Sequence, residues 1–352
     1  MSADQDIATF ISSKFKALHQ RGLFSGGLLL AACNDIPPSL HVFGLADYRS
    51  NRALSQHSLY ETASITKIFT AAAIQLLEEA KQLRLEDKLS RWLPHFPYKE
   101  VTIMNALTHT SGLPDYMDLM DAYTEKARIY NNADVISMLI LHAPSPHFQA
   151  GERYEYSNTG YVCLASVIEA ASGMSYAEFM QTFVFKPARM NKTRVYNRRI
   201  RPEAVTDLAL GWIKRDDVGY SLPDEDDAFS FVITLDGIQG DGTIHSTLGD
   251  LHAFDQALRN GQLLNRESLI RASSPHKLPD GTFTPCGIGW FLSRSASNQL
   301  LLSHSGGWPG YWSRLVRAPH EGKVLIVLAN VEVCHSTEAA LLIGEAEQLW
   351  FQ

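Results

Sequence analysis

The sequence predicts an α/β (α+β) fold in which both ends of the chain contribute to one sheet flanked by helices. Strand-like segments occur near the start of the chain and again after residue 240. The signals between these regions are mainly helical, with frequent Gly and Pro breaks. We therefore expect a discontinuous sheet domain, residues 1–82 and 240–352, and a mainly helical inserted domain, residues 83–239. A cleft between them would be a natural ligand site.

The first sheet segment begins and ends with helices. Residues 5–21 place their apolar side chains on one helical face. Two strands are expected at 27–33 and 40–45, joined by the Asn-Asp-Ile-Pro turn of residues 34–37. A further helix opens near Ser64 and can extend to about residue 82, because no Gly or Pro interrupts its buried apolar stripe.

The inserted region and the C-terminal part differ in their periodicity. Within the insert, helical patterns occupy four segments, residues 102–109, 133–142, 160–171 and 175–184. The acidic, irregular stretch 216–230 is expected to be an exposed loop. After residue 240 a helix is expected at 247–259, followed by antiparallel strands at 287–292, 300–304, 312–317 and 323–330, and a closing helix at 336–350.

Bulk composition restricts the function classes. The 352 residues are 45% hydrophobic and carry a net charge of −7, which argues against a nucleic-acid surface. The four cysteines form no CxxC pair and no zinc spacing, so they are expected to be reduced core residues. No apolar run is long enough to span a membrane, and Asp4 and Asp6 stand where a secretory signal carries Lys or Arg. These features predict a cytoplasmic protein; a protein trimmed of its signal peptide, periplasmic or secreted, would look the same.

A Ser-x-x-Lys motif at the start of the amphipathic helix carries the strongest chemical signal. Ser64 and Lys67 lie three residues apart, which puts a hydroxyl and an amine on one helical face. A helix N-terminus also directs unpaired N–H groups and a partial positive charge at such a residue. The spacing alone is weak, because Ser13 with Lys16 and Ser274 with Lys277 repeat it.

Two further motifs supply partners for Ser64. Tyr156 and Asn158 form a Tyr-x-Asn motif, in which the phenol could take the Ser64 proton if a nearby Lys67 ammonium favoured its ionised form. The alternative interpretation makes Asn158 a helix N-cap and Tyr156 a packing residue. The third motif, His304-Ser305-Gly306, is followed by Gly307 and follows a predicted strand. The backbone N–H groups of Gly307 and Ser64 could form an oxyanion hole; otherwise the segment is a glycine-rich hairpin.

The three motifs together resemble the serine β-lactamase and penicillin-binding-protein family, in its class C β-lactamase and DD-carboxypeptidase branch, which includes β-lactamase-related serine esterases. Residues 101–114, 187–193, 242–250 and 303–311 also resemble family signatures, in the family's order, across roughly residues 22–345. The resemblance implies a five-stranded antiparallel sheet flanked by helices, an all-helical lobe, and catalysis at the cleft between them.

The resemblance also implies a two-step reaction through an acyl-enzyme. Ser64 would attack the carbonyl, Lys67 and Tyr156 would shuttle protons, and Asn158 would orient the substrate or Lys67. His304, Ser305, Gly306 and Gly307 would form the substrate-binding and oxyanion edge. No metal or cofactor is implied. Trp308, Tyr116 and Tyr311 are candidates for an apolar acyl pocket.

One departure from the family pattern guides the choice of substrate. Many β-lactamases carry Lys at the first position of the third motif, whereas this chain carries His304, which is mostly neutral at pH 7. Losing one charge-assisted hydrogen bond to a substrate carboxylate costs on the order of 1.5–3 kcal/mol. We therefore expect a serine hydrolase acting on small ester or amide substrates, with esters favoured and weak β-lactam hydrolysis. The alternatives are a DD-carboxypeptidase or β-lactamase, an acyltransferase, and a catalytically silent scaffold or binding protein of the same fold.

Overall fold

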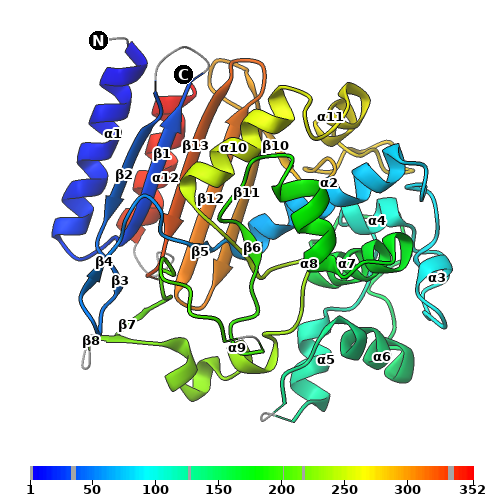
Figure 1. The fold of residues 1–352 in the computed structure, drawn as a ribbon. Coiled ribbons are helices and arrows are strands. Elements are labelled where there is room, and N and C mark those ends of the chain that lie inside the picture. Colours follow the sequence, from blue (N-terminus) through cyan, green and yellow to red (C-terminus); the bar gives the residue numbers. More distant parts are fainter. Residues whose placement is uncertain (1–2, 33–36, 126–127, 201, 216–218, 332–336) are drawn as a thin grey trace.

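The computed structural model describes residues 3–32, 37–125, 128–200, 202–215, 219–331 and 337–352. Its centre is a six-stranded antiparallel sheet in the order β10-β11-β12-β13-β1-β2 (Figure 1). The strands are β1 (Gly26–Ala31), β2 (Ser39–Phe43), β10 (Phe291–Arg294), β11 (Leu300–Trp308), β12 (Tyr311–Ala318) and β13 (Lys323–Ala329). The N-terminal pair joins the C-terminal four through β1 and β13, whose register pairs Gly26 with Ala329.

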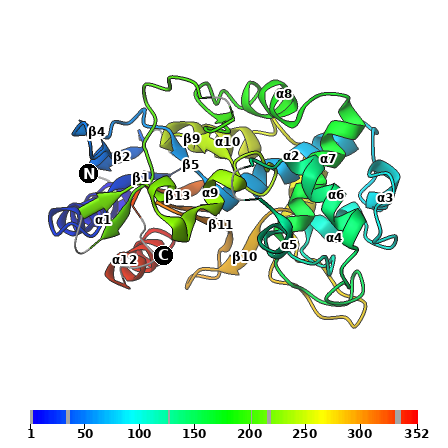
Figure 2. The same cartoon turned by 90° about the horizontal axis from the view of Figure 1, so that it is seen from below.

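Helices cover both faces of this sheet. On one face pack α1 (Ala3–Gln20) and α12 (Thr337–Trp350); on the other lie α2 (Thr66–Glu79) and α10 (Leu248–Arg259) (Figures 1 and 2). Side chains of a strand alternate between the faces, so Leu28 and Leu30 join the core beneath α1 and α12, whereas Leu29 joins the core around α2. Burial on both faces explains why β1 and β13 are continuous apolar runs.

The remaining helices gather beyond α2, at the right of Figure 1. They comprise α3 (Leu89–Trp92), α4 (Ile103–Leu107), α5 (Tyr116–Tyr123), α6 (Asn132–His142), α7 (Asn158–Ser172), α8 (Tyr176–Phe179) and α11 (Arg266–Ala272). Helix α2 contacts both α7 and the 3-10 turn that precedes α2, and Phe69 in its first turn is fully buried. Because α2 packs between the sheet and these helices, its N-terminus is placed where the two meet.

Three small sheets and a short helix connect the main parts. They are β3 (Leu45–Asp47) with β4 (Arg52–Ala53), β5 (Tyr60–Glu61) with β9 (Ile244–Ser246) and β6 (Arg194–Val195), and β7 (Ile213–Arg215) with β8 (Gly219–Ser221), together with α9 (Phe231–Thr234). Strand β5 runs directly into the start of α2, so pairing with β9 fixes the chain just before Ser64.

The expected α/β (α+β) class with an antiparallel sheet flanked by helices is confirmed, with one correction. The resemblance implied five strands, and the sheet has six. The edge strand β2 overlaps the strand expected at 40–45, whereas β10 begins at Phe291 and shares only its first two residues with the strand expected at 287–292. The division into domains at residues 82 and 239 stays a prediction.

Two local expectations differ from the structure. The helix expected at 175–184 is α helical only at Tyr176–Phe179 and continues as a π-helical turn, Met180–Phe185. An exposed loop is expected at 216–230, of which residues 216–218 lie outside the described ranges; the remainder contains β8 and two 3-10 turns, and its Asp224 is only partly exposed. Asp224, Glu225 and Asp226 pair with arginines, which explains why this acidic stretch packs onto the fold.

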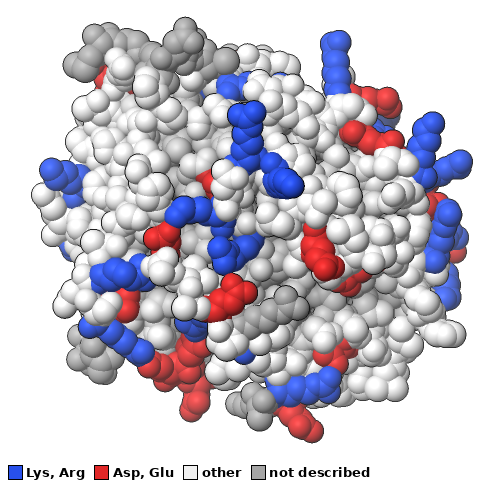
Figure 3. Space-filling view, viewed as in Figure 1, with Lys and Arg blue, Asp and Glu red and all other residues white. Residues whose placement is uncertain are grey.

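The sequence predictions about cysteines, membrane spans and surface charge can be compared with the structure. Cys163 and Cys286 are buried and free, while Cys33 and Cys334 lie outside the described residues. Within the described ranges, no helix is both long and apolar enough to cross a membrane. On the face shown in Figure 3, Lys and Arg are interspersed with Asp and Glu and form no continuous basic patch.

Candidate active site

Ser64 lies in a 3-10 turn, Ala63–Ile65, immediately before α2, and hydrogen bonds to neighbouring strands hold this turn in place. The Thr62 backbone N–H and side-chain hydroxyl both donate to the Ile244 carbonyl oxygen, at 2.9 and 2.8 Å. The Ser313 hydroxyl donates to the Thr62 carbonyl oxygen at 2.7 Å. Ala63 adopts a left-handed conformation with φ 47°, which costs on the order of 1–3 kcal/mol for a non-glycine residue. The turn is therefore held in an unfavourable conformation by its neighbours, and Ser64 is presented from it.

Lys67 contacts Ser64 as the motif predicts. Its Nζ donates to Ser64 Oγ at 3.0 Å and to the Asp241 carbonyl oxygen at 2.9 Å. The side chain is fully buried, and Nζ lies 5.1 Å from the centroid of the Tyr156 ring. A buried ammonium held by fixed acceptors has little freedom to leave the nucleophile.

Tyr156 lies beside Ser64 and Lys67 with its aromatic ring near the Lys67 ammonium. The ring stacks on His109 with centroids 4.4 Å apart, and 37% of the residue is exposed. Among the described residues, no hydrogen bond joins its phenol to Ser64 or Lys67. The structure thus brings Tyr156 beside Lys67, and its role as a base stays a prediction.

His109 positions the Tyr-x-Asn motif, a role that the sequence analysis missed. Its Nδ1 accepts the Ser157 backbone N–H at 3.0 Å, so the neutral ring carries its proton on Nε2. Burial, together with nearby Lys67, lowers the pKa of His109 well below its usual range. The histidine stands in the segment 101–114 that resembles a family signature, and that signal could have marked it.

Asn158 begins α7 and lines the same cavity as Ser64. The N-cap of α7 is Ser157, whose Oγ accepts the Gly160 N–H at 3.1 Å. The capping role considered for Asn158 therefore belongs to its neighbour, and the Asn158 side chain is left to face the cavity.

His304 is buried in β11 and is 2% exposed. Its Nδ1 lies 2.6 Å from the Ser305 carbonyl oxygen, which can only accept, so Nδ1 carries the proton. Its Nε2 is buried without a hydrogen-bond partner among the described residues. Burial first, and then the Lys67 charge, lowers the pKa of His304 to about 3, so the ring is neutral at pH 7.

The glycines of the third motif differ in their surroundings. A Cβ atom on Gly306 would lie 2.3 Å from the Thr62 oxygen and 2.9 Å from Ser64 N, so β11 packs directly against the Ser64 turn. A Cβ atom on Gly307 would meet no atom within 4 Å, and Gly307 lines the cavity. Ser305 is exposed and, like His304, is not among the residues that line the cavity. Substrate-binding roles for Ser305 and His304 stay predictions.

A cavity of about 380 Å³ opens at Ser64. Tyr116, Trp308 and Tyr311, the expected acyl-pocket residues, all line it. Its other apolar walls are Met117, Phe229, Phe231, Leu235, Ile238 and Pro309. None of the described lining residues is Lys or Arg, whereas two, Glu61 and Asp241, are acids.

The two acids were missed because their neighbours come from distant parts of the chain. Asp241 accepts the Tyr116 hydroxyl at 3.0 Å, and burial raises its pKa although the Lys67 charge opposes this. Glu61 is half-buried three residues before Ser64, and burial raises its pKa to about 7 against the opposing charge of Arg199. Proximity in sequence to Ser64 was the available signal for Glu61.

Comparisons with known proteins agree with the motifs. A family model described as Beta-lactamase matches residues 14–348. Penicillin-binding protein 4* of Bacillus subtilis (strain 168) is 45% identical over 344 residues, covering 97% of this chain and 75% of that protein. A D-aminopeptidase of Brucella anthropi is 25% identical over 327 residues, covering 88% of this chain and 59% of that protein.

A solved structure shows the same fold. The crystal structure of a penicillin-binding protein from Bacillus halodurans superposes with a TM-score of 0.80 at 26% identity. The superposition covers 97% of this chain and 98% of that protein. The sheet, the helices beyond α2 and their connection are therefore those of a known architecture.

Proposed function

Because this chain belongs to the beta-lactamase family, we propose that it is a serine hydrolase that cleaves ester or amide substrates through an acyl-enzyme, with esters favoured. The observation that carries the proposal is the 3.0 Å contact between Ser64 Oγ and Lys67 Nζ at the edge of the cavity. Hydrogen bonds between Thr62 and strands β9 and β12 fix the turn that carries Ser64, and the Asp241 carbonyl oxygen accepts from Lys67. The nucleophile is therefore preorganised.

Acylation begins with attack of Ser64 Oγ on the substrate carbonyl carbon. The serine proton passes to the Lys67–Tyr156 pair, and the carbonyl oxygen gains a negative charge near the backbone N–H groups of Ser64 and Gly307. When the tetrahedral intermediate collapses, the bond to the leaving alcohol or amine breaks. That group departs with the proton that Ser64 gave up, which balances the first step.

Deacylation repeats the same chemistry with water. A water molecule attacks the acyl carbon, its proton passes to the same pair, and the acid product leaves as Ser64 regains a proton. Asn158 lines the cavity with Ser64, which supports a role for it in orienting the acyl group. These steps use the side chains and backbone of the protein, the substrate and one water molecule.

The charge of the cavity supports esters over β-lactams and C-terminal D-Ala-D-Ala peptides. Both of the latter carry a carboxylate, and no described lining residue of the cavity supplies a cation to hold it. His304 is neutral at pH 7, and the Lys67 ammonium already contacts Ser64 and Asp241. A carboxylate would also approach Glu61 and Asp241, which disfavours it further.

A labelling experiment with a substrate panel tests the proposal. A fluorophosphonate probe should label the folded protein, and Ser64→Ala should abolish the label. The panel contains 4-nitrophenyl butyrate, a D-Ala-D-Ala peptide and a chromogenic cephalosporin, and we expect the highest kcat/KM for the ester. Cephalosporin turnover without ester cleavage would overturn the ranking, and absence of labelling would favour a binding protein that has lost catalysis.

An added-nucleophile experiment separates hydrolysis from acyl transfer. The ester is cleaved in the presence of an added alcohol or amine, and the products are identified by mass. Free acid as the main product supports a hydrolase. Predominant transfer to the added acceptor would identify an acyltransferase instead.

A further inference from the structure

Glu61 contributes to the walls of two neighbouring cavities. It lines the 380 Å³ cavity at Ser64, and it also lines an adjoining polar cavity of about 40 Å³. The larger cavity is shaped to hold a substrate, whereas the smaller has room for one or a few water molecules. A carboxylate at this junction can contact a polar group on a substrate whose reacting carbonyl sits at Ser64.

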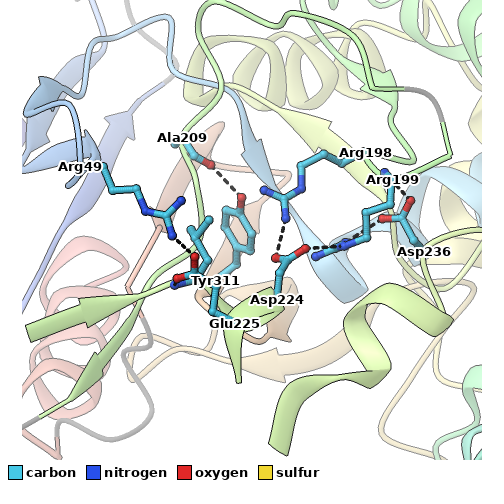
Figure 4. Close-up of polar contacts among 9 residues, drawn as sticks. Arg49, Arg198, Arg199, Ala209, Asp224, Glu225, Asp236 and Tyr311 are labelled. Atoms are coloured by element: carbon cyan, nitrogen blue, oxygen red, sulfur yellow. Dashed lines mark hydrogen bonds and ion pairs between the residues drawn. The ribbon is translucent and has the colours of Figure 1, made fainter. Parts of the chain in front are cut away.

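The other charged residues around the small cavity are already paired. Arg199 donates to Asp224 at 2.7 Å and to Asp236 at 2.8 Å, and Arg198 also pairs with Asp224 (Figure 4). Two arginines and two aspartates therefore compensate one another beside Glu61. In Figure 4 these pairs come from separate segments that converge on one side of Tyr311.

Glu61 lacks such a partner. Within the part of the chain that the structure describes, its carboxylate makes no hydrogen bond and no ion pair. Asp241 differs, because its carboxylate accepts from Tyr116 and its negative charge faces the Lys67 ammonium. Of the two acids in the cavity, Glu61 is the one that still needs a cation.

Apolar side chains line the same cavity as this acid. Phe231 and Trp308 meet edge to face with ring centroids 5.4 Å apart, and both line the cavity. The site therefore combines a nucleophile, an uncompensated carboxylate and an aromatic wall. A matching substrate combines a carbonyl, a cation close to it and an apolar side chain.

We propose that Glu61 binds the free ammonium group of the substrate, so that the cavity selects esters and amides of apolar amino acids whose amine is unblocked. This inference rests on the proposed function, since Ser64 must react with the carbonyl. Glu61 acts here as a specificity-determining residue, and the same substrate without its amine remains a substrate with lower kcat/KM.

The electrostatic surroundings of Glu61 favour this pairing. Burial disfavours the bare carboxylate, and Asp236 and Asp241 repel it, whereas Arg198 and Arg199 stabilise it. His245, its register partner on β9, is buried and neutral at pH 7. An incoming ammonium supplies the charge that these neighbours leave uncompensated.

A matched pair of esters tests the proposal. Phenylalanine methyl ester and methyl 3-phenylpropanoate share a skeleton and a leaving group and differ in the amine. Both enantiomers of the amino ester are measured, and the faster one is used. A charge-assisted hydrogen bond predicts that its kcat/KM exceeds that of the ester without the amine by about tenfold or more. Equal values, or a preference for the ester without the amine, would overturn the proposal.

Variants assign the preference to Glu61. Glu61→Gln should reduce the ratio of the two kcat/KM values by about tenfold, and Glu61→Asp should restore part of it. The control is Glu225→Gln, which removes a nearby carboxylate that pairs with Arg49 and does not line the cavity (Figure 4). A ratio that falls equally in both acid-to-amide variants would show a general charge effect and contradict the assignment.

Competition in the unmodified protein gives an independent measurement. Phenethylammonium should inhibit cleavage of 4-nitrophenyl butyrate at a concentration about tenfold lower than 2-phenylethanol. Equal inhibition, or tighter binding of 3-phenylpropanoate, would contradict an ammonium site even if Glu61→Gln failed to fold. Absence of any ester cleavage or Ser64 labelling would instead refute the proposed function, so the two failures are distinguishable.

Discussion

At the scale of single residues, the site depends on groups that act in pairs. Lys67 holds Ser64 at hydrogen-bond distance, and the Tyr156 ring lies over the same ammonium. His109 in turn holds both the Tyr156 ring and the backbone that follows it. Loss of one member should therefore disable its partner.

Lys67→Ala and Tyr156→Phe test this coupling. Each variant should lower kcat/KM for 4-nitrophenyl butyrate by about 100-fold or more, the scale of losing a general base. The double variant should lose little beyond the worse single variant, because the two groups form one proton-transfer unit. Steady-state kinetics of the unmodified protein, the two single variants and the double variant complete a double-mutant cycle. Near-native turnover by Tyr156→Phe would remove the phenol from the base role.

His304→Lys tests the link between charge and substrate class. A permanent cation in place of a neutral imidazole should raise kcat/KM for a chromogenic cephalosporin by about tenfold or more, if it reaches the substrate carboxylate. His304→Gln is the neutral control, and thermal unfolding of both variants checks that the buried position tolerates the change. Equal cephalosporin activity in the two variants would show that position 304 does not contact the carboxylate.

At the scale of secondary-structure elements, the site depends on how closely β11 approaches the start of α2. Gly306 allows this approach, because any side chain there would collide with Thr62 and Ser64. The strand and the helix come from residues far apart in sequence, so their contact is a property of the sheet. Separation of these two elements would enlarge the proposed oxyanion site and misplace Ser64.

Gly306→Ala should therefore destabilise the fold and nearly abolish acylation of Ser64. Overpacking of this kind typically costs about 1–3 kcal/mol. Gly344→Ala is the matched control, because Gly344 is exposed in α12 and its Cβ would meet nothing within 4 Å. It should stabilise the protein by roughly 0.5–1 kcal/mol through helix propensity. Urea unfolding and fluorophosphonate labelling measure both effects; unchanged stability of Gly306→Ala would contradict the close packing.

Elements with strong periodicity could be predicted from sequence, whereas short ones could not. The strands that flank β13 and the helix after Ser64 carry apolar patterns dictated by burial on both faces of the sheet. Strand β5 has only two residues, Tyr60 and Glu61, and its pairing with β9 depends on a partner far along the chain. The combination of motifs singles out Ser64, Lys67 and Tyr156, which the structure brings close together, and their catalytic roles stay predictions. The role suggested for Glu61 depends on which charges of distant segments are already paired, and no local pattern records that.

At the scale of the whole molecule, several histidines are buried in their neutral form. Burial lowers the pKa of His245 and of His304 to about 3, and lowers that of His109 well below its usual range. Unfolding exposes these rings, whose ordinary pKa is near 6.5, so the unfolded chain binds more protons than the folded one below that pH. Stability should accordingly fall as pH decreases from about 6.5 towards 3.

His245→Gln tests this acid sensitivity. Each buried neutral histidine should account for about 2 kcal/mol of the stability lost between pH 7 and pH 5. The variant should therefore lose about that much less over this interval than the unmodified protein. Urea unfolding at both pH values measures the difference, and His320→Gln, an exposed position, is the control. An identical pH dependence in all three proteins would contradict a neutral buried His245.

The pairing of β1 with β13 has a consequence for biosynthesis. Gly26 pairs with Phe43 on one side and with Ala329 on the other, so the central sheet can close only after β13 has been synthesised. Until then the apolar strand β1 has an unsatisfied edge, and β11 has not yet arrived beside Ser64. A nascent chain interrupted before β13 would expose this strand edge and be prone to self-association.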